Sequence, residues 1–256
     1  MSLIQVSFFS ETLNMFTAAN VILPLPQNPE TPVGDLPVLV LLHGMSDDFT
    51  AWQRKTAVER YALEHDLAVV MPDGGMSSWE NMRHGARVRD FVLDELPETM
   101  RRMFPLSAAR EKNFIAGCSM GGYGALKLAL ARPESYSAVG CLSGSHMEYR
   151  SENPIIRAML DRVYDGEIDA ADARIVEDAK NVAAGKLPMY IYHSCGDCDL
   201  LRENAEKTRD FLSALGGAVD YRFEMLPGRH DWTLWDESLR RFIESLPLTP
   251  PQQTVF

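Results

Sequence analysis

The fold is decided by residues 115–130, which read IAGCSMGGYGALKLAL. A short apolar run ends at Gly117, and the chain then reads as an amphipathic helix, with Ser119 at the turn between the two. A strand, a sharp turn and a helix form the context in which a G-x-S-x-G pattern predicts a nucleophile elbow. Gly117 and Gly121 support this interpretation. A Cβ at either position would clash where strand and helix cross beside the serine, and glycine also tolerates strained dihedrals.

The composition is that of one globular domain covering residues 1–256, with 46% hydrophobic and 24% charged residues. A formal charge of −11 argues against nucleic acid or an anionic membrane surface as a partner. The first nine residues lack the pattern of a signal peptide, and no apolar run reaches the length of a membrane span. We therefore expect a cytoplasmic protein whose four cysteines (Cys118, Cys141, Cys195 and Cys198) are free thiols.

Strand patterns alternate with helix patterns along the chain, which predicts a mostly parallel sheet of about eight strands with helices on both faces. The predicted strands are residues 4–9, 16–23, 38–42, 67–71, 114–116, 138–142, 189–193 and 219–225, the first two as an antiparallel pair at a sheet edge and the last half exposed. The predicted helices are residues 50–65, opened by a capping box of Thr50 and Gln53, 88–103, kinked or restarted at Pro97, 201–215 and 232–246. Residues 146–186 show two helical patterns and no strand, and we interpret them as a small cap over the carboxyl edge of the sheet. Residues 23–37 and the tail from Pro247 are proline-rich, which predicts a loop and an irregular end.

Active sites of such sheets lie at the carboxyl ends of the strands, and the chemically useful residues follow strands here. Ser119, Asp199 and His230 occur in the chain order expected for α/β-hydrolases. Acyl transfer needs these three residue types, because an imidazole must take the serine proton while a carboxylate holds the imidazole in the required tautomer. The backbone N–H groups of Met120 and Met45 are the candidate oxyanion donors.

Several of these residues have rivals. Asp197 lies in the same loop as Asp199 and is the alternative acid, although a turn-shaping role suits it better. His43 belongs to the predicted oxyanion loop, and His193 has the position of a hydrogen-bonded core histidine at a strand end. The substrate-pocket candidates are Trp52, Trp79, His146 and Trp232, where the tryptophans could equally be core residues. A single C-x-x-C at residues 195–198 is a weak signal for metal or redox use.

Four motifs together resemble the esterase D and tributyrin esterase family of α/β-hydrolases. They are H-G-M at residues 43–45, G-C-S-M-G-G-Y-G-A-L at 117–126, C-G-x-x-D-x-L at 195–201 and G-x-H-D-W-x-x-W at 228–235. The paired N-terminal strands and Glu95-Leu96-Pro97 extend the resemblance over nearly the whole chain. The family alignment favours Asp199 over Asp197 as the acid. Two departures matter. Asp47 and Asp48 stand where tributyrin esterases usually have Gly-Asn-like residues, and Ser46-Asp47 offers no cysteine of the kind that S-formylglutathione hydrolases carry there.

The resemblance implies a serine carboxylesterase that hydrolyses short-chain acyl esters through an acyl-enzyme, without metal or cofactor. Relatives acting on S-formylglutathione, feruloyl esters or acylated sugars make a thioesterase or a sugar or feruloyl esterase the alternative. A noncatalytic binding protein with a hydrolase fold is the alternative of another class. The expected partner is a small acyl ester, and relatives of this kind are often homodimers or homotetramers.

Overall fold

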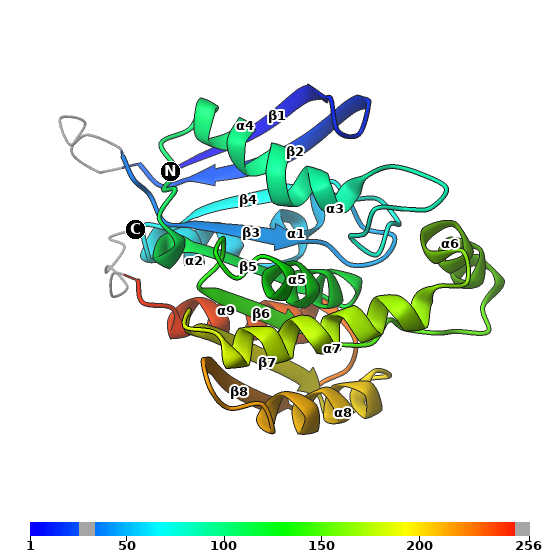
Figure 1. Cartoon of the computed structure of the whole chain (residues 1–256). Helices are drawn as coiled ribbons and strands as arrows, with labels where there is room; N and C mark the ends of the chain where they lie inside the picture. Colours follow the sequence, from blue (N-terminus) through cyan, green and yellow to red (C-terminus); the bar gives the residue numbers. More distant parts are fainter. Residues whose placement is uncertain (26–33, 249–256) are drawn as a thin grey trace.

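The computed structural model describes residues 1–25 and 34–248. Within them, eight strands form one sheet in the order β1-β2-β4-β3-β5-β6-β7-β8 (Figure 1). The strands are β1 Ser2–Ser10, β2 Met15–Leu23, β3 Val38–Leu42, β4 Ala68–Pro72, β5 Asn113–Cys118, β6 Ala138–Leu142, β7 Met189–Gly196 and β8 Val219–Leu226. β2 pairs antiparallel with both β1 and β4, and the strands from β4 to β8 pair in parallel. The predicted fold class, the antiparallel edge pair and the peripheral last strand are confirmed. Most of the predicted loop at 23–37 and of the tail from Pro247 lies outside the described residues.

Helices cover both faces of this sheet. They are α1 Ala51–Lys55, α2 Val58–Glu64, α3 Val88–Asp90, the π-helical turn η1 Phe91–Glu95, α4 Leu96–Met103, the short 3₁₀ turn η2 Arg110–Lys112, α5 Met120–Ala131, α6 Pro154–Tyr164, α7 Ile168–Ala184, α8 Arg202–Ser213 and α9 Trp232–Ser245. In Figure 1, α4, α5 and α7 lie in front of the sheet and α9 lies behind it. Side chains of β3 alternate between two buried clusters: Val38, Val40 and Leu42 face α4 and α5, whereas Leu39 and Leu41 face α2 and α9. The central strands are therefore apolar on both faces, as parallel strands between two helix layers must be.

The prediction of one helix at residues 50–65 is wrong in two respects. It is broken into α1 and α2 at Thr56, which adopts an extended conformation and whose hydroxyl accepts a bond from the Val58 N–H, at the start of α2, at 3.3 Å. The capping box is also absent: the Thr50 side chain makes no cap bond and donates instead to Asp48 Oδ1 at 2.6 Å, while Gln53 accepts a bond from Asn20. Competing side-chain bonds to nearby groups thus outweighed the capping pattern.

The helix predicted at residues 88–103 restarts at Pro97, as expected. Pro97 has no N–H, and in a regular α-helix its ring would clash with the carbonyl four residues earlier. The chain avoids this with the π turn η1, which closes with a bond from the Leu96 N–H to the Phe91 carbonyl. α4 then continues from Leu96 with the proline in its first turn.

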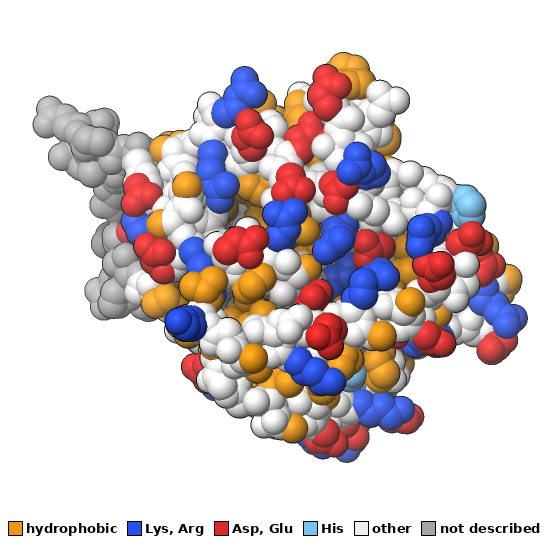
Figure 2. Space-filling view, viewed as in Figure 1, with side chains coloured by type: hydrophobic (Ala, Val, Ile, Leu, Met, Phe, Trp, Pro, Cys, Tyr) orange, Lys and Arg blue, Asp and Glu red, His pale blue; other side chains and the backbone are white. Residues whose placement is uncertain are grey.

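The two helices of residues 146–186 occupy different places. α6 lies beyond the carboxyl ends of the strands, at the right of Figure 1, whereas α7 runs across the front of the sheet and contacts α5. α7 thus forms the crossover between the parallel strands β6 and β7, and α6 with the loop before it forms the part nearest to the sheet's carboxyl edge. No helix in the described residues combines the length and the apolarity needed to cross a bilayer. On the face shown in Figure 2, acidic and basic side chains are interspersed.

Candidate active site

Ser119 lies at the tip of a tight turn between β5 and α5. Its backbone has φ 54° and ψ −119°, a strained conformation for a residue other than glycine. A Cβ on Gly117 would lie 2.4 Å from the Gly121 carbonyl oxygen, and one on Gly121 would lie 2.4 Å from the Leu42 oxygen. The two glycines therefore allow α5 to cross against β3 and β5, which holds the serine at the carboxyl edge of the sheet.

His230 and Asp199 reach this serine from two loops that follow neighbouring strands. Asp199 follows β7 and His230 follows β8. The His230 Nε2 atom lies 2.8 Å from the Ser119 hydroxyl oxygen, and Nδ1 lies 2.9 Å from Asp199 Oδ1. A carboxylate only accepts hydrogen bonds, so Nδ1 carries the proton and Nε2 accepts the bond from the serine hydroxyl. The structure thus brings together three of the predicted site residues in a hydrogen-bonded chain.

The Asp199 carboxylate is held in the ionised form. Burial alone would raise its pKa, but hydrogen bonds from His230 and from the Leu201 N–H, at 2.8 Å, outweigh burial and leave the pKa below its ordinary value. Its side chain has no exposed surface, whereas the His230 side chain is 16% exposed. The rival Asp197 instead accepts a bond from the Gly228 N–H at 3.0 Å, which ties the two loops together.

The candidate oxyanion donors flank Ser119. Met120 is the first residue of α5, where a backbone N–H has no partner within the helix. Met45 follows β3, and its N–H makes no backbone hydrogen bond to another described residue. His43 fixes this loop: its Nε2 accepts from the Gly74 N–H at 3.0 Å, so its Nδ1 donates to the Gly44 carbonyl at 2.8 Å.

Two of the tryptophans predicted to line a pocket are buried supports of this edge. Trp52 is 1% exposed and donates to the Leu42 carbonyl at 2.9 Å, and Trp79 is 0% exposed and donates to the His43 carbonyl at 3.2 Å. Neither side chain offers surface to a ligand in this conformation. Trp232 is half-buried and packs edge-on against Trp52.

The other two histidines considered above, His146 and His193, bond to groups other than Ser119. His146 is 9% exposed, stacks on Phe211 of α8 and bonds to Thr208 Oγ1 at 2.9 Å. His193 is fully buried, with Nδ1 2.8 Å from the Tyr221 hydroxyl, and burial lowers its pKa to about 3. It is thus a neutral core histidine.

Sequence reasoning missed two groups beside the site. Ser143, which follows β6, accepts a bond from Trp235 Nε1 at 3.0 Å, and the Trp235 ring stands edge-on to His230 at 5.0 Å. The pattern G-x-H-D-W-x-x-W could have indicated Trp235 as a residue of the site, because it places Trp235 one helical turn after Trp232.

The second missed group is a buried polar network between α5 and α6. The Tyr164 hydroxyl donates to Glu148 Oε2 at 2.9 Å and lies 3.1 Å from the Tyr123 hydroxyl. On the same helix as Tyr123, Lys127 pairs with Glu80 at 3.1 Å, with side-chain exposures of 5% and 14%. The network connects α6 and the loop before it to the helix that begins at the candidate nucleophile. Its members lie far apart in sequence and share no pattern.

The described residues, 1–25 and 34–248, contain no group of three His, Cys, Asp or Glu side chains arranged to hold a metal ion. All four cysteines are unpaired, and of the C-x-x-C pair Cys195 is buried while Cys198 is exposed.

Serine, acid and histidine in this chain order, at the carboxyl edge of a mostly parallel sheet, define the class of protein as an α/β-hydrolase. The family model described as "Putative esterase" matches residues 10–244, and the chain belongs to this esterase family. The chain is similar to an acetyl esterase of Caldicellulosiruptor saccharolyticus, with 28% identity over 267 residues that cover 95% of this chain and 97% of that protein.

Two solved structures from Staphylococcus aureus resemble it over their whole length. One is the fluorophosphonate-binding serine hydrolase FphF, with a TM-score of 0.84 and 34% identity over 96% of this chain and 98% of that one. The other is the S-formylglutathione hydrolase FrmB, with a TM-score of 0.81, 34% identity and the same coverage. Family and relatives together identify the chain as an ester hydrolase.

Proposed function

We propose that this protein is a serine carboxylesterase that hydrolyses short-chain acyl esters through an acyl-enzyme intermediate. The observation that carries the proposal is the hydrogen-bonded chain from Ser119 through His230 to Asp199. The resemblance to tributyrin esterases and the similarity to an acetyl esterase favour small acyl groups.

In the first half of the reaction, the Ser119 oxygen attacks the ester carbonyl while His230 Nε2 takes the hydroxyl proton. The negative charge on the carbonyl oxygen is stabilised by the N–H groups of Met45 and Met120. When the tetrahedral intermediate collapses, His230 returns the proton to the leaving alcohol, and the acyl group stays on Ser119. Water then attacks the acyl-enzyme by the same route, releasing the acid and restoring the serine hydroxyl. Asp199 stays ionised throughout and stabilises the imidazolium.

Ser119→Ala tests the proposal, with Ser213→Ala, an exposed serine at the end of α8, as the matched control. We expect the alanine at 119 to abolish hydrolysis of p-nitrophenyl acetate and butyrate and labelling by a fluorophosphonate, while circular dichroism stays unchanged. The variant at 213 should keep both. Comparable turnover by a folded Ser119→Ala protein would refute the assignment.

A thioesterase acting on S-formylglutathione is the second candidate, favoured by the 34% identity to FrmB. Against it stands the segment Ser46-Asp47, which has no cysteine at the position where such enzymes carry one. The Asp47 carboxylate also lies close to Gly44 in the proposed oxyanion loop. A Cβ placed on Gly44 would lie 3.3 Å from the Asp47 Oδ2 atom. The ratio of kcat/KM for S-formylglutathione to that for p-nitrophenyl acetate separates the two, because only a thioesterase should prefer the thioester. Feruloyl and acetylated-sugar esters complete the comparison.

We also propose that the protein acts in the cytoplasm. The support is chemical: four free thiols, including the exposed Cys198, suit a reducing compartment.

A further inference from the structure

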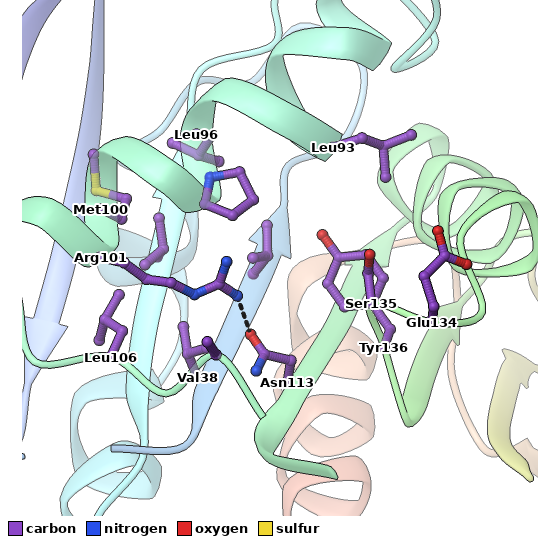
Figure 3. Close-up of a pocket in the computed structure, with 14 residues that line it drawn as sticks. Val38, Leu93, Leu96, Met100, Arg101, Leu106, Asn113, Glu134, Ser135 and Tyr136 are labelled. Carbon is purple, nitrogen blue, oxygen red and sulfur yellow. Dashed lines mark hydrogen bonds between the residues drawn. The ribbon is translucent and has the colours of Figure 1, made fainter. Parts of the chain in front are cut away.

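A cavity of about 140 Å³ lies at the amino ends of the parallel strands, whereas Ser119 follows the carboxyl end of β5. Figure 3 shows the residues that line it. It lies among the first residues of β3 and β5, the π turn η1, α4 and the loop before β6. The buried apolar part of its wall includes Val38, Val40, Val70, Leu93, Leu96 and Met100, each at most 8% exposed, and Pro97, Leu106 and Ala108 line it nearer to the surface. An engineered apolar cavity of about 150 Å³ holds a benzene molecule, so the volume of this space matches that of an alkyl chain of about four to six carbons.

One cation lines this cavity. Figure 3 shows the Arg101 guanidinium extending from α4 toward the middle of the cavity. It donates to Asn113 Oδ1 at 2.8 Å through Nη2 and to the Ser107 carbonyl at 3.1 Å through Nε. Asn113 is itself fixed by bonds from its amide nitrogen to the carbonyls of Ser107 and Ala109. The guanidinium is therefore held in one orientation by neutral acceptors.

Among the residues that the structure describes, no carboxylate pairs with Arg101. Within residues 1–25 and 34–248, no acidic side chain comes within 4.0 Å of its nitrogens, and its hydrogen bonds are made through Nε and Nη2, which leaves Nη1 free. A half-buried guanidinium that is fixed in orientation and has a free N–H edge has the geometry that suits a carboxylate.

A second polar group lines the cavity from the other side. Tyr136 is 3% exposed, and its hydroxyl makes no hydrogen bond to another described residue. Burial raises the pKa of Tyr136 to about 12, so its hydroxyl is neutral and can donate a hydrogen bond. Glu134, exposed at the same side of the cavity in Figure 3, adds a negative charge away from Arg101. A carboxylate bound on the Glu134 side would be repelled, which leaves the Arg101 side as the one that suits a carboxylate.

We propose that this cavity is a binding site for a short-chain monocarboxylate, separate from the Ser119 site. The carboxylate would bind the free edge of Arg101, and the alkyl chain would fill the space between β3, β4 and α4. An acid of this class is what ester hydrolysis releases, but the proposal rests on the cavity alone and holds whether or not Ser119 is catalytic.

The test uses methionine methyl groups as local reporters. Met100 lines the cavity, whereas Met45 and Met120 flank Ser119. In protein labelled with ¹³C at the methionine methyls, with the Met100 signal assigned through Met100→Leu, we expect butyrate and hexanoate to shift Met100 in a saturable way. Butyramide and 1-butanol, which lack the charge, and succinate, which has a second one, should bind at least about tenfold more weakly.

Arg101→Gln should weaken butyrate binding at Met100 by about tenfold or more, and Arg102→Gln, the exposed neighbour on α4, should leave it unchanged. If Arg101→Gln does not fold, the comparison of butyrate with butyramide on the wild-type protein decides. Equal binding of the neutral and charged ligands, unchanged binding in a folded Arg101→Gln variant, or butyrate shifts confined to Met45 and Met120 would each overturn the proposal. Loss of turnover in Ser119→Ala without loss of butyrate binding keeps this proposal distinct from the esterase assignment.

Discussion

Asp199→Asn gives the sharpest test of the site, because the structure predicts which way the new amide will point. Asp199 Oδ1 accepts two bonds, from His230 Nδ1 at 2.9 Å and from the Leu201 N–H at 2.8 Å. The backbone N–H is always a donor, so it holds the amide oxygen of an asparagine at the Oδ1 position. The NH₂ group then takes the place of Oδ2, which is buried and has no hydrogen-bond partner within the described residues. His230 therefore keeps its proton on Nδ1, and Nε2 stays free to accept the Ser119 proton.

The magnitude follows from the lost charge. Unit charges about 4 Å apart at an effective dielectric constant of about 20 interact by about 4 kcal/mol, which is about 10³-fold in rate. The amide dipole keeps part of this stabilisation of the imidazolium, so we expect kcat/KM for p-nitrophenyl butyrate to fall by about 10²- to 10³-fold. A substitution that reversed the tautomer would cost about 10⁴-fold.

The assay combines kinetics with ¹⁵N NMR of histidine, which reports which ring nitrogen carries the proton. Asp197→Asn is the matched control in the same loop and should change kcat/KM by no more than a few fold, since Asp197 bonds to Gly228 and not to His230. A loss of about 10⁴-fold or more in Asp199→Asn with the proton on Nε2 would refute the orientation argument. Equal losses in the two variants would refute Asp199 as the acid.

Three further outcomes are expected. Ser119→Gly should unfold at higher urea concentration than Ser119→Ala and be more stable by about 1 kcal/mol, because both lack the hydroxyl but only glycine relieves the strain at φ 54°; equal midpoints would contradict this. Glu80→Gln should lower the free energy of unfolding by about 3 to 5 kcal/mol, because it leaves Lys127 buried and unpaired. Adding Lys127→Met should restore most of that free energy, and additive losses in the double variant would show that the pair is not coupled. Burial raises the pKa of Glu148 above its ordinary value of 4.5, so the folded protein binds this proton more tightly than the unfolded chain and loses stability as pH rises from 4.5 through the folded pKa. Glu148→Gln removes that loss, and its stability relative to wild type, from urea unfolding at a series of pH values, should therefore increase with pH; a flat difference would exclude the raised pKa.

The sheet could be predicted from the sequence because its strands are marked by strong local signals. The run from Val38 to Leu42 is apolar throughout, which only a strand buried on both faces requires, and β8 alternates because one of its faces is open. Ser119 could be predicted for a related reason. Gly117 and Gly121, each two residues from the serine, are required where α5 crosses closely against β3 and β5. The broken helix at Thr56 was not predictable, because the bond from the Val58 N–H to the Thr56 hydroxyl at the start of α2 forms only in this conformation.

The supporting residues of the site could not be predicted for a different reason. Trp79 reads as a pocket candidate in the sequence, yet it is 0% exposed and supports the loop of His43. The bond between Tyr164 and Glu148 joins a helix to the loop that precedes it, and its register depends on how α6 packs. Propensity and periodicity report on neighbours within an element, whereas these contacts depend on where separate elements meet.

Backbone strain ties the site to the stability of the sheet. Ser46, Ser119 and Ser143 have φ values of 64°, 54° and 48°, and they follow β3, β5 and β6, three adjacent strands of the sheet. Residues in such conformations cost on the order of 1 to 3 kcal/mol each and persist only where the surrounding structure fixes them. Here the fixing contacts come from neighbouring strands, since the Ser119 N–H bonds to the Leu142 carbonyl and the Ser143 N–H to the Ser194 carbonyl. The parallel ladder that the apolar sequence runs specify is therefore also what holds the candidate nucleophile and its surroundings in position.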